Sequence, residues 1–229
     1  MDFVIRVFGS IRITDNISIY ITETLLVAWL IAIVLSIFAI VVSIKARKWQ
    51  ALDKPTGLQN VVELIVDAFD KFFVASAGSK LVYLSPWFFT LFVFLLIANS
   101  VGIFGLRPPT ADWGMTFPLA LFSLIMFQYA GLRHRPKNYL KGFFAPVFIF
   151  FPINLIGEIA KPVALSFRLF GNVLGGVILI SLLYGMAPLI MQLGFPAFLH
   201  AYFDIAAGLL QAFIFTVLSI TFLGLAAED

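Results

Sequence analysis

The stretch Leu25–Ile44, LLVAWLIAIVLSIFAIVVSI, contains no charged residue. About 20 apolar residues in a helix span the hydrocarbon core of a bilayer. Of all 229 residues, 62% are hydrophobic and only 12% charged, whereas soluble domains carry about 25% charged residues. The sequence therefore predicts an integral membrane protein. The first apolar run is short and interrupted by Arg6 and Arg12, which is not typical of a cleaved signal peptide.

Four further regions approach the length of a span, at about 87–104, 117–132, 143–190 and 195–227. As one helix, the region 143–190 would measure about 70 Å, more than twice the bilayer core. It must therefore tilt strongly, lie partly in the membrane plane, or break. Places to break or bend are Pro146, Pro152, Gly157 and Pro162. We predict one all-α membrane domain over 1–229, with about five transmembrane helices, the last two long and strongly tilted.

Between the first two spans, residues of about 58–76 show the pattern of an amphipathic helix. Apolar residues recur at helical spacing, namely Leu58, Val61, Val62, Ile65, Phe69, Phe72 and Phe73. The other face carries Glu63, Asp67, Asp70 and Lys71. This pattern predicts an interfacial helix. A helix packed on other subunits is the alternative, because helices on lipid surfaces are usually Lys-rich on the polar face.

Basic residues in the loops predict the orientation of the chain. They follow the first span (Lys45, Arg47, Lys48 and Lys54) and the third (Arg133, Arg135, Lys137 and Lys141), whereas the loop after the second span has only Arg107. Loops rich in Lys and Arg stay in the cytoplasm. We therefore expect a multi-pass protein of the cell inner (plasma) membrane, with the N-terminus outside and the C-terminus in the cytoplasm. Basic residues scattered in this way do not indicate nucleic-acid binding.

Several chemistries have no residues to support them. The chain has no cysteine and two histidines, His134 and His200, so no thiolate or histidine metal site is expected. It has no P-loop, Gly-x-Ser-x-Gly or His-Glu-x-x-His motif. We therefore expect no cofactor, no metal and no catalytic chemistry in this chain alone.

The functional signal is a set of ionisable residues inside the last two apolar regions. These are Glu158, Lys161, Arg168 and Asp204, accompanied by the polar residues Asn172 and Gln211. A charge at the centre of a span costs about 2.5–3.5 kcal/mol. Such residues therefore require water, a counter-charge or a partner protein, and they mark an ion or substrate pathway.

Arg168 is the strongest candidate, because an arginine stays charged in a low dielectric. Lys161, Arg168 and Asn172 share one helix face. Beside that face, the small residues Gly171, Gly175 and Gly176 would let another helix approach closely. Arg168 is suited to pairing with a moving carboxylate or expelling its proton. The alternative is a buried ion pair that only holds helices together.

Two acids flank Arg168 along the membrane normal. Asp204 and Gln211 project from one side of a helix, and Asp204 lies about 10 Å nearer the outside than Gln211. Between them lies Gly208, a fourth small residue that permits close helix packing. Glu158 lies about 15 Å nearer the cytoplasm than Arg168. This arrangement predicts two offset aqueous half-paths. A local salt bridge from Glu158 to Lys161 is an open alternative, and His200 either relays protons or packs at the interface.

The run Lys161–Asn172, KPVALSFRLFGN, followed by Gly208–Phe215, GLLQAFIF, resembles the signature of bacterial F-type ATP synthase subunit a. The resemblance implies a stator ion-channel subunit with two offset half-channels for H⁺ or Na⁺. It implies that Arg168 faces the carboxylates of a c-ring, with Asn172 and Gln211 as polar neighbours and Asp204 in the outer half-channel. Peripheral stalk b subunits and the lipid bilayer are the other implied partners.

The chain departs from this family at one place. Many relatives have Glu or Asp in the turn after the Gly-Asn pair, where this chain has Gly176 and Val177. We therefore expect Asp204 to serve the outer path alone, with His200 and ordered water. A secondary transporter with Arg168 binding an anionic substrate is the rival function, but the chain shows no matching repeats. A structural scaffold, the third interpretation, leaves the intramembrane charges without purpose.

Overall fold

The computed structural model describes residues 7–14, 17–47, 49, 57–186, 198–199 and 201–227. Within this part, five helical segments are long and apolar enough to cross a membrane. They are Glu23–Ala46, Ser79–Phe104, Trp113–His134, Phe148–Met186 and Ala201–Ala227. The predicted all-α membrane fold with five long apolar helices is confirmed.

A short antiparallel hairpin, which was not expected from the sequence, precedes the first helix. Strand β1 (Val7–Thr14) pairs with β2 (Ile17–Thr22). The sequence of β2, ISIYIT, alternates apolar and hydroxyl-bearing residues, which is the period of a strand. The hairpin continues directly into α1 (Glu23–Ala46), so the N-terminal segment is folded onto the start of the first span.

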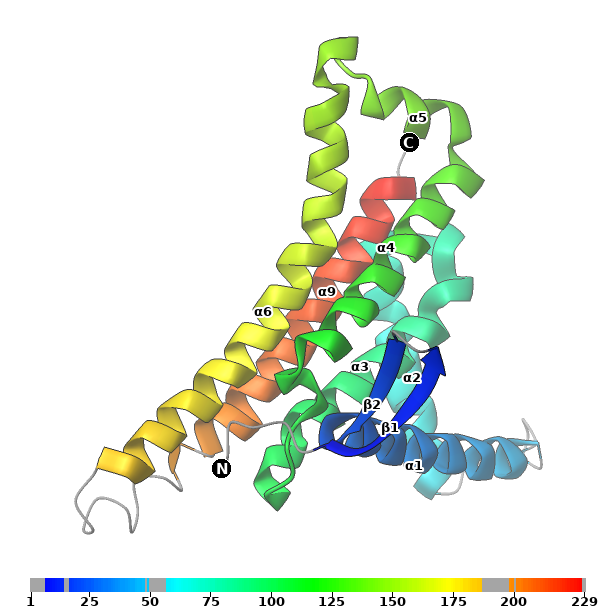
Figure 1. The fold of residues 1–229 in the computed structure, drawn as a ribbon. Helices are drawn as coiled ribbons and strands as arrows, with labels where there is room; N and C mark the ends of the chain where they lie inside the picture. Colours follow the sequence, from blue (N-terminus) through cyan, green and yellow to red (C-terminus); the bar gives the residue numbers. More distant parts are fainter. Residues whose placement is uncertain are drawn as a thin grey trace.

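Helices α3 (Ser85–Ser100), α4 (Trp113–His134), α6 (Phe151–Met186) and α9 (Gly208–Ala227) form the main bundle (Figure 1). Helix α9 packs against all the others. Fully buried side chains at the centre of the bundle include Phe73, Phe88, Leu95, Phe127, Leu169, Phe215 and Leu223. The core thus joins the C-terminal helix to every other long helix except α1.

Helix α6 shows how the chain accommodates the long fourth apolar region. It is one helix of 36 residues, about 54 Å long, and Figure 1 shows that it changes direction along its length. Pro162 lies inside it and is buried. Within residues 136–186, the helical path is interrupted before α6, between α5 (Pro136–Phe143) and the 3₁₀ turn η4 (Phe148–Phe150). In its described part, up to Met186, the fourth region therefore forms the turn η4 and a single bent helix, while α5 lies almost entirely before it.

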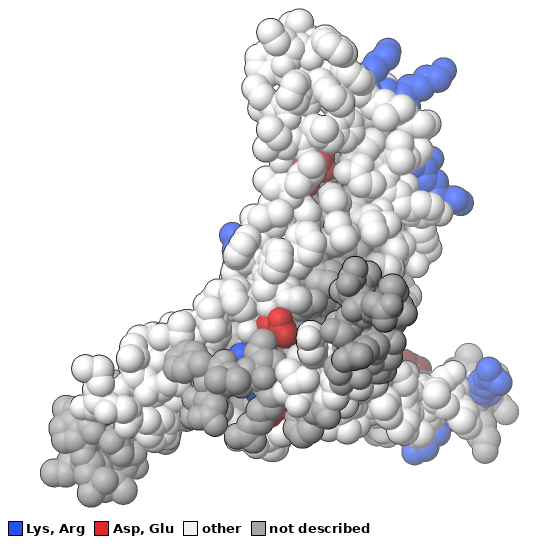
Figure 2. Space-filling model, viewed as in Figure 1, with Lys and Arg blue, Asp and Glu red and all other residues white. Residues whose placement is uncertain are grey.

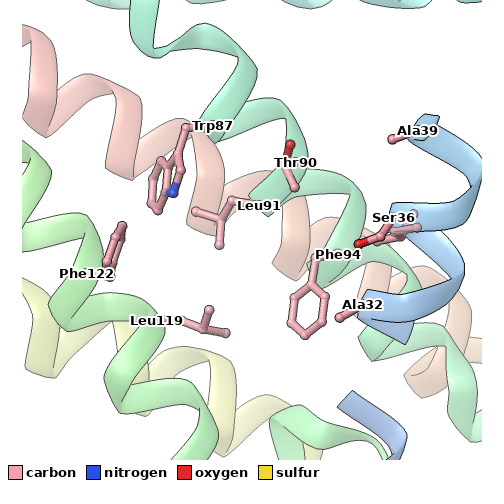
Figure 3. A pocket seen from close by; sticks show the side chains of 10 residues that line it. Ala32, Ser36, Ala39, Trp87, Thr90, Leu91, Phe94, Leu119 and Phe122 are labelled. Carbon is pink, nitrogen blue, oxygen red and sulfur yellow. The ribbon is translucent and has the colours of Figure 1, made fainter. Parts of the chain in front are cut away.

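Helix α1 packs on the bundle through its first half only. Its buried residues Val27 and Ile31 contact Ala98 near the end of α3 and Val101 just after it, while the second half extends away (Figure 1). An apolar groove of about 400 Å³ separates that half from α3 and α4 (Figure 3). Lipid or a partner must cover this half of α1, because it exposes apolar residues on every side.

The amphipathic helix α2 (Gly57–Ala77) packs its second half on this chain's own bundle. Phe73 is fully buried, and Ser85 at the start of α3 donates a hydrogen bond to Asp70. The first half exposes apolar residues such as Leu64. For that half, a lipid surface and another subunit both stay open as partners.

The loop between α3 and α4 is fixed by Asp112, the N-cap of α4. Its Oδ1 accepts a hydrogen bond from the Gly114 amide at 2.9 Å, and its Oδ2 accepts one from Thr24 Oγ1 at 3.2 Å. The chain reaches it through the 3₁₀ turns η2 (Val101–Phe104) and η3 (Pro109–Ala111). Between them, Gly105 has φ +71°, a conformation that favours glycine. The starts of α1 and α4 are therefore tied together.

Candidate functional site

Arg168 lies on the outer surface of α6. Its neighbours Leu165, Ser166 and Leu169 are buried, whereas Arg168 itself is exposed. Among the residues described by the structure, none forms an ion pair or hydrogen bond with Arg168. The guanidinium is therefore available to a partner outside the described part of the chain.

Trp113 braces the turn that bears Arg168. Its Nε1 donates a hydrogen bond to Ser166 Oγ at 3.3 Å, and its ring stacks on Phe167, with centroids 5.8 Å apart and planes at 26°. Ser166 Oγ in turn donates to the carbonyl oxygen of Val163 at 3.0 Å. With these side chains fixed against α4, Arg168 projects outward from α6.

The two polar residues predicted to share a face with Arg168 both engage other groups. Lys161 forms an ion pair with Glu158, and its Nζ lies 5.4 Å from the centre of the Phe222 ring. Asn172 Nδ2 donates to the carbonyl oxygen of Ala207 at 3.5 Å, the long limit for a hydrogen bond. Of these three residues, only Arg168 is left without an interaction within the described residues.

Glu158 belongs to a polar cluster that joins α4, α5 and α6. Besides the ion pair with Lys161, its Oε2 accepts a hydrogen bond from Gln128 Nε2 at 3.5 Å. Tyr139 Oη donates to Gln128 Oε1 at 2.8 Å. Burial and the nearby Glu158 carboxylate raise the pKa of Tyr139 to about 12, although its hydrogen bond to Gln128 opposes the shift. The local salt bridge, one of the two interpretations of Glu158, is therefore present.

Asp204 lies in a π-helical turn, η5 (Ala201–Ala207), that leads into α9. Its carboxylate lies directly against Gly102, because a Cβ built on Gly102 would be 2.8–3.0 Å from the three carboxyl atoms. A cavity of about 20 Å³ adjoins the carboxylate and is bounded by Val173, Gly176 and Phe203, among others. This volume is enough for about one water molecule.

The π-helical turn changes the relation expected between Asp204 and Gln211. A π-turn holds more residues than an α-turn, so the seven-residue spacing no longer puts the two side chains on one line. Asp204 instead meets Gly102. Gln211 is buried in α9, and its Nε2 has no hydrogen-bond partner in the described part of the chain. Since an unpaired buried amide is costly, Gln211 indicates a place for water or a partner's polar group.

The four glycines predicted to permit close packing fall into two pairs. A Cβ on Gly176 would lie 3.0 Å from the Phe203 ring, and one on Gly208 would lie 3.0 Å from Asn99 Cβ. Added Cβ atoms on Gly171 and Gly175 would meet nothing within 4 Å. Close packing within the chain thus uses the first pair, and the second pair remains a prediction for a partner helix.

His200 lies outside the described residues, so its predicted role stays a prediction. Within the described ranges, no group of three His, Cys, Asp or Glu residues is placed to hold a metal ion. The sequence pattern did not reveal a role for Asn99, whose Nδ2 donates to the Gly208 carbonyl oxygen at 2.9 Å and whose Oδ1 accepts from Thr110 at 2.7 Å. An amide inside an apolar span was the signal available for it.

Comparison with known proteins gives a consistent result. The model of the family described as "ATP synthase A chain" matches residues 25–224. The chain is 36% identical over 176 residues to ATP synthase subunit a of Acidothermus cellulolyticus, covering 73% of this chain and 64% of that protein. It is 40% identical over 151 residues to the sodium ion specific ATP synthase subunit a of Propionigenium modestum, covering 58% and 51%. It is 36% identical over 171 residues to the ATP synthase subunit a of Moorella thermoacetica, covering 74% of this chain and 76% of that protein. The chain therefore spans less than two thirds of the first two relatives.

Proposed function

Because the chain belongs to the ATP synthase A chain family, we propose that it is the stator subunit of a rotary ATP synthase that conducts H⁺ or Na⁺ past a ring of c subunits. The observation that carries this proposal is the exposure of Arg168 without a partner among the described residues. A permanent charge in a membrane span costs about 2.5–3.5 kcal/mol. A carboxylate on a neighbouring protein would compensate that cost.

In this proposal, an ion enters from outside past Asp204 and neutralises a ring carboxylate. The neutral group then rotates into lipid at low cost. When it returns, the charge of Arg168 lowers the pKa of the ring carboxyl and favours release towards Glu158 and the cytoplasm. Each elementary charge that crosses gains about 2.3 kcal/mol per 100 mV. Arg168 also repels a cation that would pass directly between the two paths.

The placement of the polar groups supports separate outer and inner paths. Asp204 has a cavity beside it with room for about one water, and Gln211 presents an unpaired buried amide among the described residues. Asn172 bridges α6 to the end of the π-turn. Glu158 lies ten residues before Arg168 along α6, about 15 Å away. His200 is proposed as a further outer residue because it is near Asp204 in sequence.

We further propose the plasma membrane as the location, with the N-terminus outside and the C-terminus in the cytoplasm. Figure 2 shows Lys and Arg gathered over α5 and the end of α4, and near the far end of α1. Loops with this charge face the cytoplasm. Peripheral stalk b subunits are proposed as further partners, for which the second half of α1 offers exposed apolar surface. H⁺ and Na⁺ both fit, because the ion-binding groups would lie mostly on the ring.

The test replaces Arg168 by Ala in the complete complex, reconstituted in vesicles. ATP-driven ion pumping should fall to background, while Arg133→Ala, which changes an exposed arginine bonded to Tyr129, should pump normally. Arg168→Lys should restore little, since a lysine can lose its proton. Unchanged pumping by Arg168→Ala would overturn the proposal.

A further inference from the structure

Asn99 near the end of α3 and Gly102 in the following turn η2 contact the segment that contains Asp204, in antiparallel order. Asn99 meets Gly208, and Gly102, three residues later, meets Asp204. Resting on the role proposed above for Asp204, we infer that Asn99 and Gly102 are positioning residues, which hold the π-helical turn and so fix where the Asp204 carboxylate lies in the outer path.

Asn99 anchors the point at which the π-turn passes into α9. Its side chain is 2% exposed, and both ends of its amide are used: Nδ2 donates to the Gly208 carbonyl oxygen, and Oδ1 accepts from Thr110. A carbonyl oxygen can accept two hydrogen bonds, so this contact does not require the helix to give up its own. Asn172 donates to the preceding carbonyl, that of Ala207. Two amides from two helices thus bind consecutive carbonyls at the junction.

The helices approach closely here because Gly208 has no side chain. A Cβ on Gly208 would lie 3.0 Å from Asn99 Cβ and 3.4 Å from its carbonyl oxygen. At this distance the backbone of the 201–208 segment is held directly by α3. Since π-helical turns are rare and favoured only in particular surroundings, these contacts explain why this segment keeps one.

Gly102 then determines the position of the acid itself. The carboxylate occupies the space that a side chain at position 102 would need, with all three carboxyl atoms 2.8–3.0 Å from the ideal Cβ position. Real Cβ atoms essentially never lie so close, so any larger residue would displace the carboxylate. The displaced group would leave its place beside the small cavity that also adjoins Gly176.

The experiment compares Gly102→Ala and Asn99→Leu with matched controls in the complete complex. Ser100→Ala is the control for Asn99, because within the described ranges the Ser100 hydroxyl bonds only to the Leu96 carbonyl of its own helix. Gly142→Ala is the control for Gly102, because an added Cβ there meets nothing within 4 Å. Three quantities are measured for each variant: the amount of chain assembled with the ring, the dependence of ATP synthesis on the external concentration of the coupling ion, and the dependence of ATP-driven pumping on its internal concentration.

We expect both variants to raise the half-saturating external ion concentration about tenfold, as misplacement of a functional group by about 1 Å commonly costs at least that much. Assembly, and the half-saturating internal concentration in ATP-driven pumping, should stay as in the controls. If Asn99→Leu fails to assemble, Gly102→Ala decides alone, since it keeps both hydrogen bonds of Asn99.

The variant Asp204→Asn separates this inference from the proposed function. A large loss of ion translocation in Asp204→Asn, together with control-like behaviour of Gly102→Ala, would overturn the inference and leave the proposed function intact. A change in assembly without a shift in the external half-saturation would show a structural role only and also overturn it. Near-normal translocation in Asp204→Asn would instead refute the proposed outer path.

Discussion

Replacing Glu158 by Gln removes the carboxylate that pairs with Lys161 but keeps the size of the side chain. Two unit charges 4 Å apart attract by about 4 kcal/mol at an effective dielectric constant of about 20. The paired side chains are 31% exposed for Lys161 and 21% for Glu158, so solvent weakens this attraction. Exposed pairs contribute about 0–1 kcal/mol, whereas breaking a fully buried pair costs about 3–5 kcal/mol. For this intermediate case we expect about 2 kcal/mol, between those two ranges.

The same cost is expected for Lys161→Met, which leaves Glu158 unpaired. In the double variant Glu158→Gln/Lys161→Met, no charge is left behind, so the loss should be about 2 kcal/mol smaller than the sum of the single losses. Denaturant unfolding of the chain in detergent measures these free energies. The amount of chain recovered with the ring measures assembly, and ATP-driven pumping in vesicles measures function.

If Glu158 serves the inner path, the double variant should be no less stable than either single variant and should assemble as well as they do, but it should not pump. Full pumping by the double variant would refute that reasoning, because it would show that Glu158 acts only as the counter-charge of Lys161. Strictly additive losses in stability would refute the electrostatic part, since they would show that the two charges do not interact. Gln128 retains an acceptor in Glu158→Gln, so its hydrogen bond does not confuse the comparison.

Gly131→Ala should destabilise the chain by about 2 kcal/mol, because its Cβ would lie 2.6 Å from the Tyr139 ring, whereas Gly142→Ala should not; equal unfolding free energies would contradict this. Tyr139→Phe should cost about 1 kcal/mol by removing the bond to Gln128. The pKa of this phenol is about 12 in the folded chain and about 10 in the unfolded chain. Its contribution to stability is therefore lost as the pH rises between these values. Tyr139→Phe should abolish this loss, which the free energy of unfolding measured against pH would show. Trp113→Phe should raise the passive ion leak per assembled complex, since it removes the hydrogen bond to Ser166 that braces the turn of Arg168. Trp87→Phe is the control, because Trp87 is in a similar stack on Phe122 at 5.5 Å, and it should leave the leak at the level of the unsubstituted chain.

The sequence was sufficient to predict the number and nature of the long helices. Length and apolar composition decide which segments span a bilayer, and Leu25–Ile44 lies wholly inside α1. It named Pro146, which lies in the turn between α5 and η4, among four possible breaks, but it did not single this residue out. Pro162 lies within α6, because packed neighbours in a membrane protein compensate the hydrogen bond that proline removes. The N-terminal hairpin, whose strands have 8 and 6 residues, was not predicted.

In the site as well, composition was sufficient to predict some features, whereas others depend on tertiary contacts. Arg168 could be named from its charge alone, because a permanent charge inside an apolar region is costly and is kept where it serves a function. The surroundings of Asp204 could not, because the segment 201–208 contacts Asn99 and Gly102, which lie far earlier in the chain. A spacing rule for an α-helix assumes that no neighbouring element alters the helix.

The contact between Gly102 and Asp204 also links the two positions through evolutionary change. Together they fill one space of fixed size, so a residue larger than glycine at 102 requires a different side chain, or a different backbone path, at 204. Substitutions at these positions should therefore arise in pairs across related chains, with the acid group free to move from one helix to the other while the total volume is preserved.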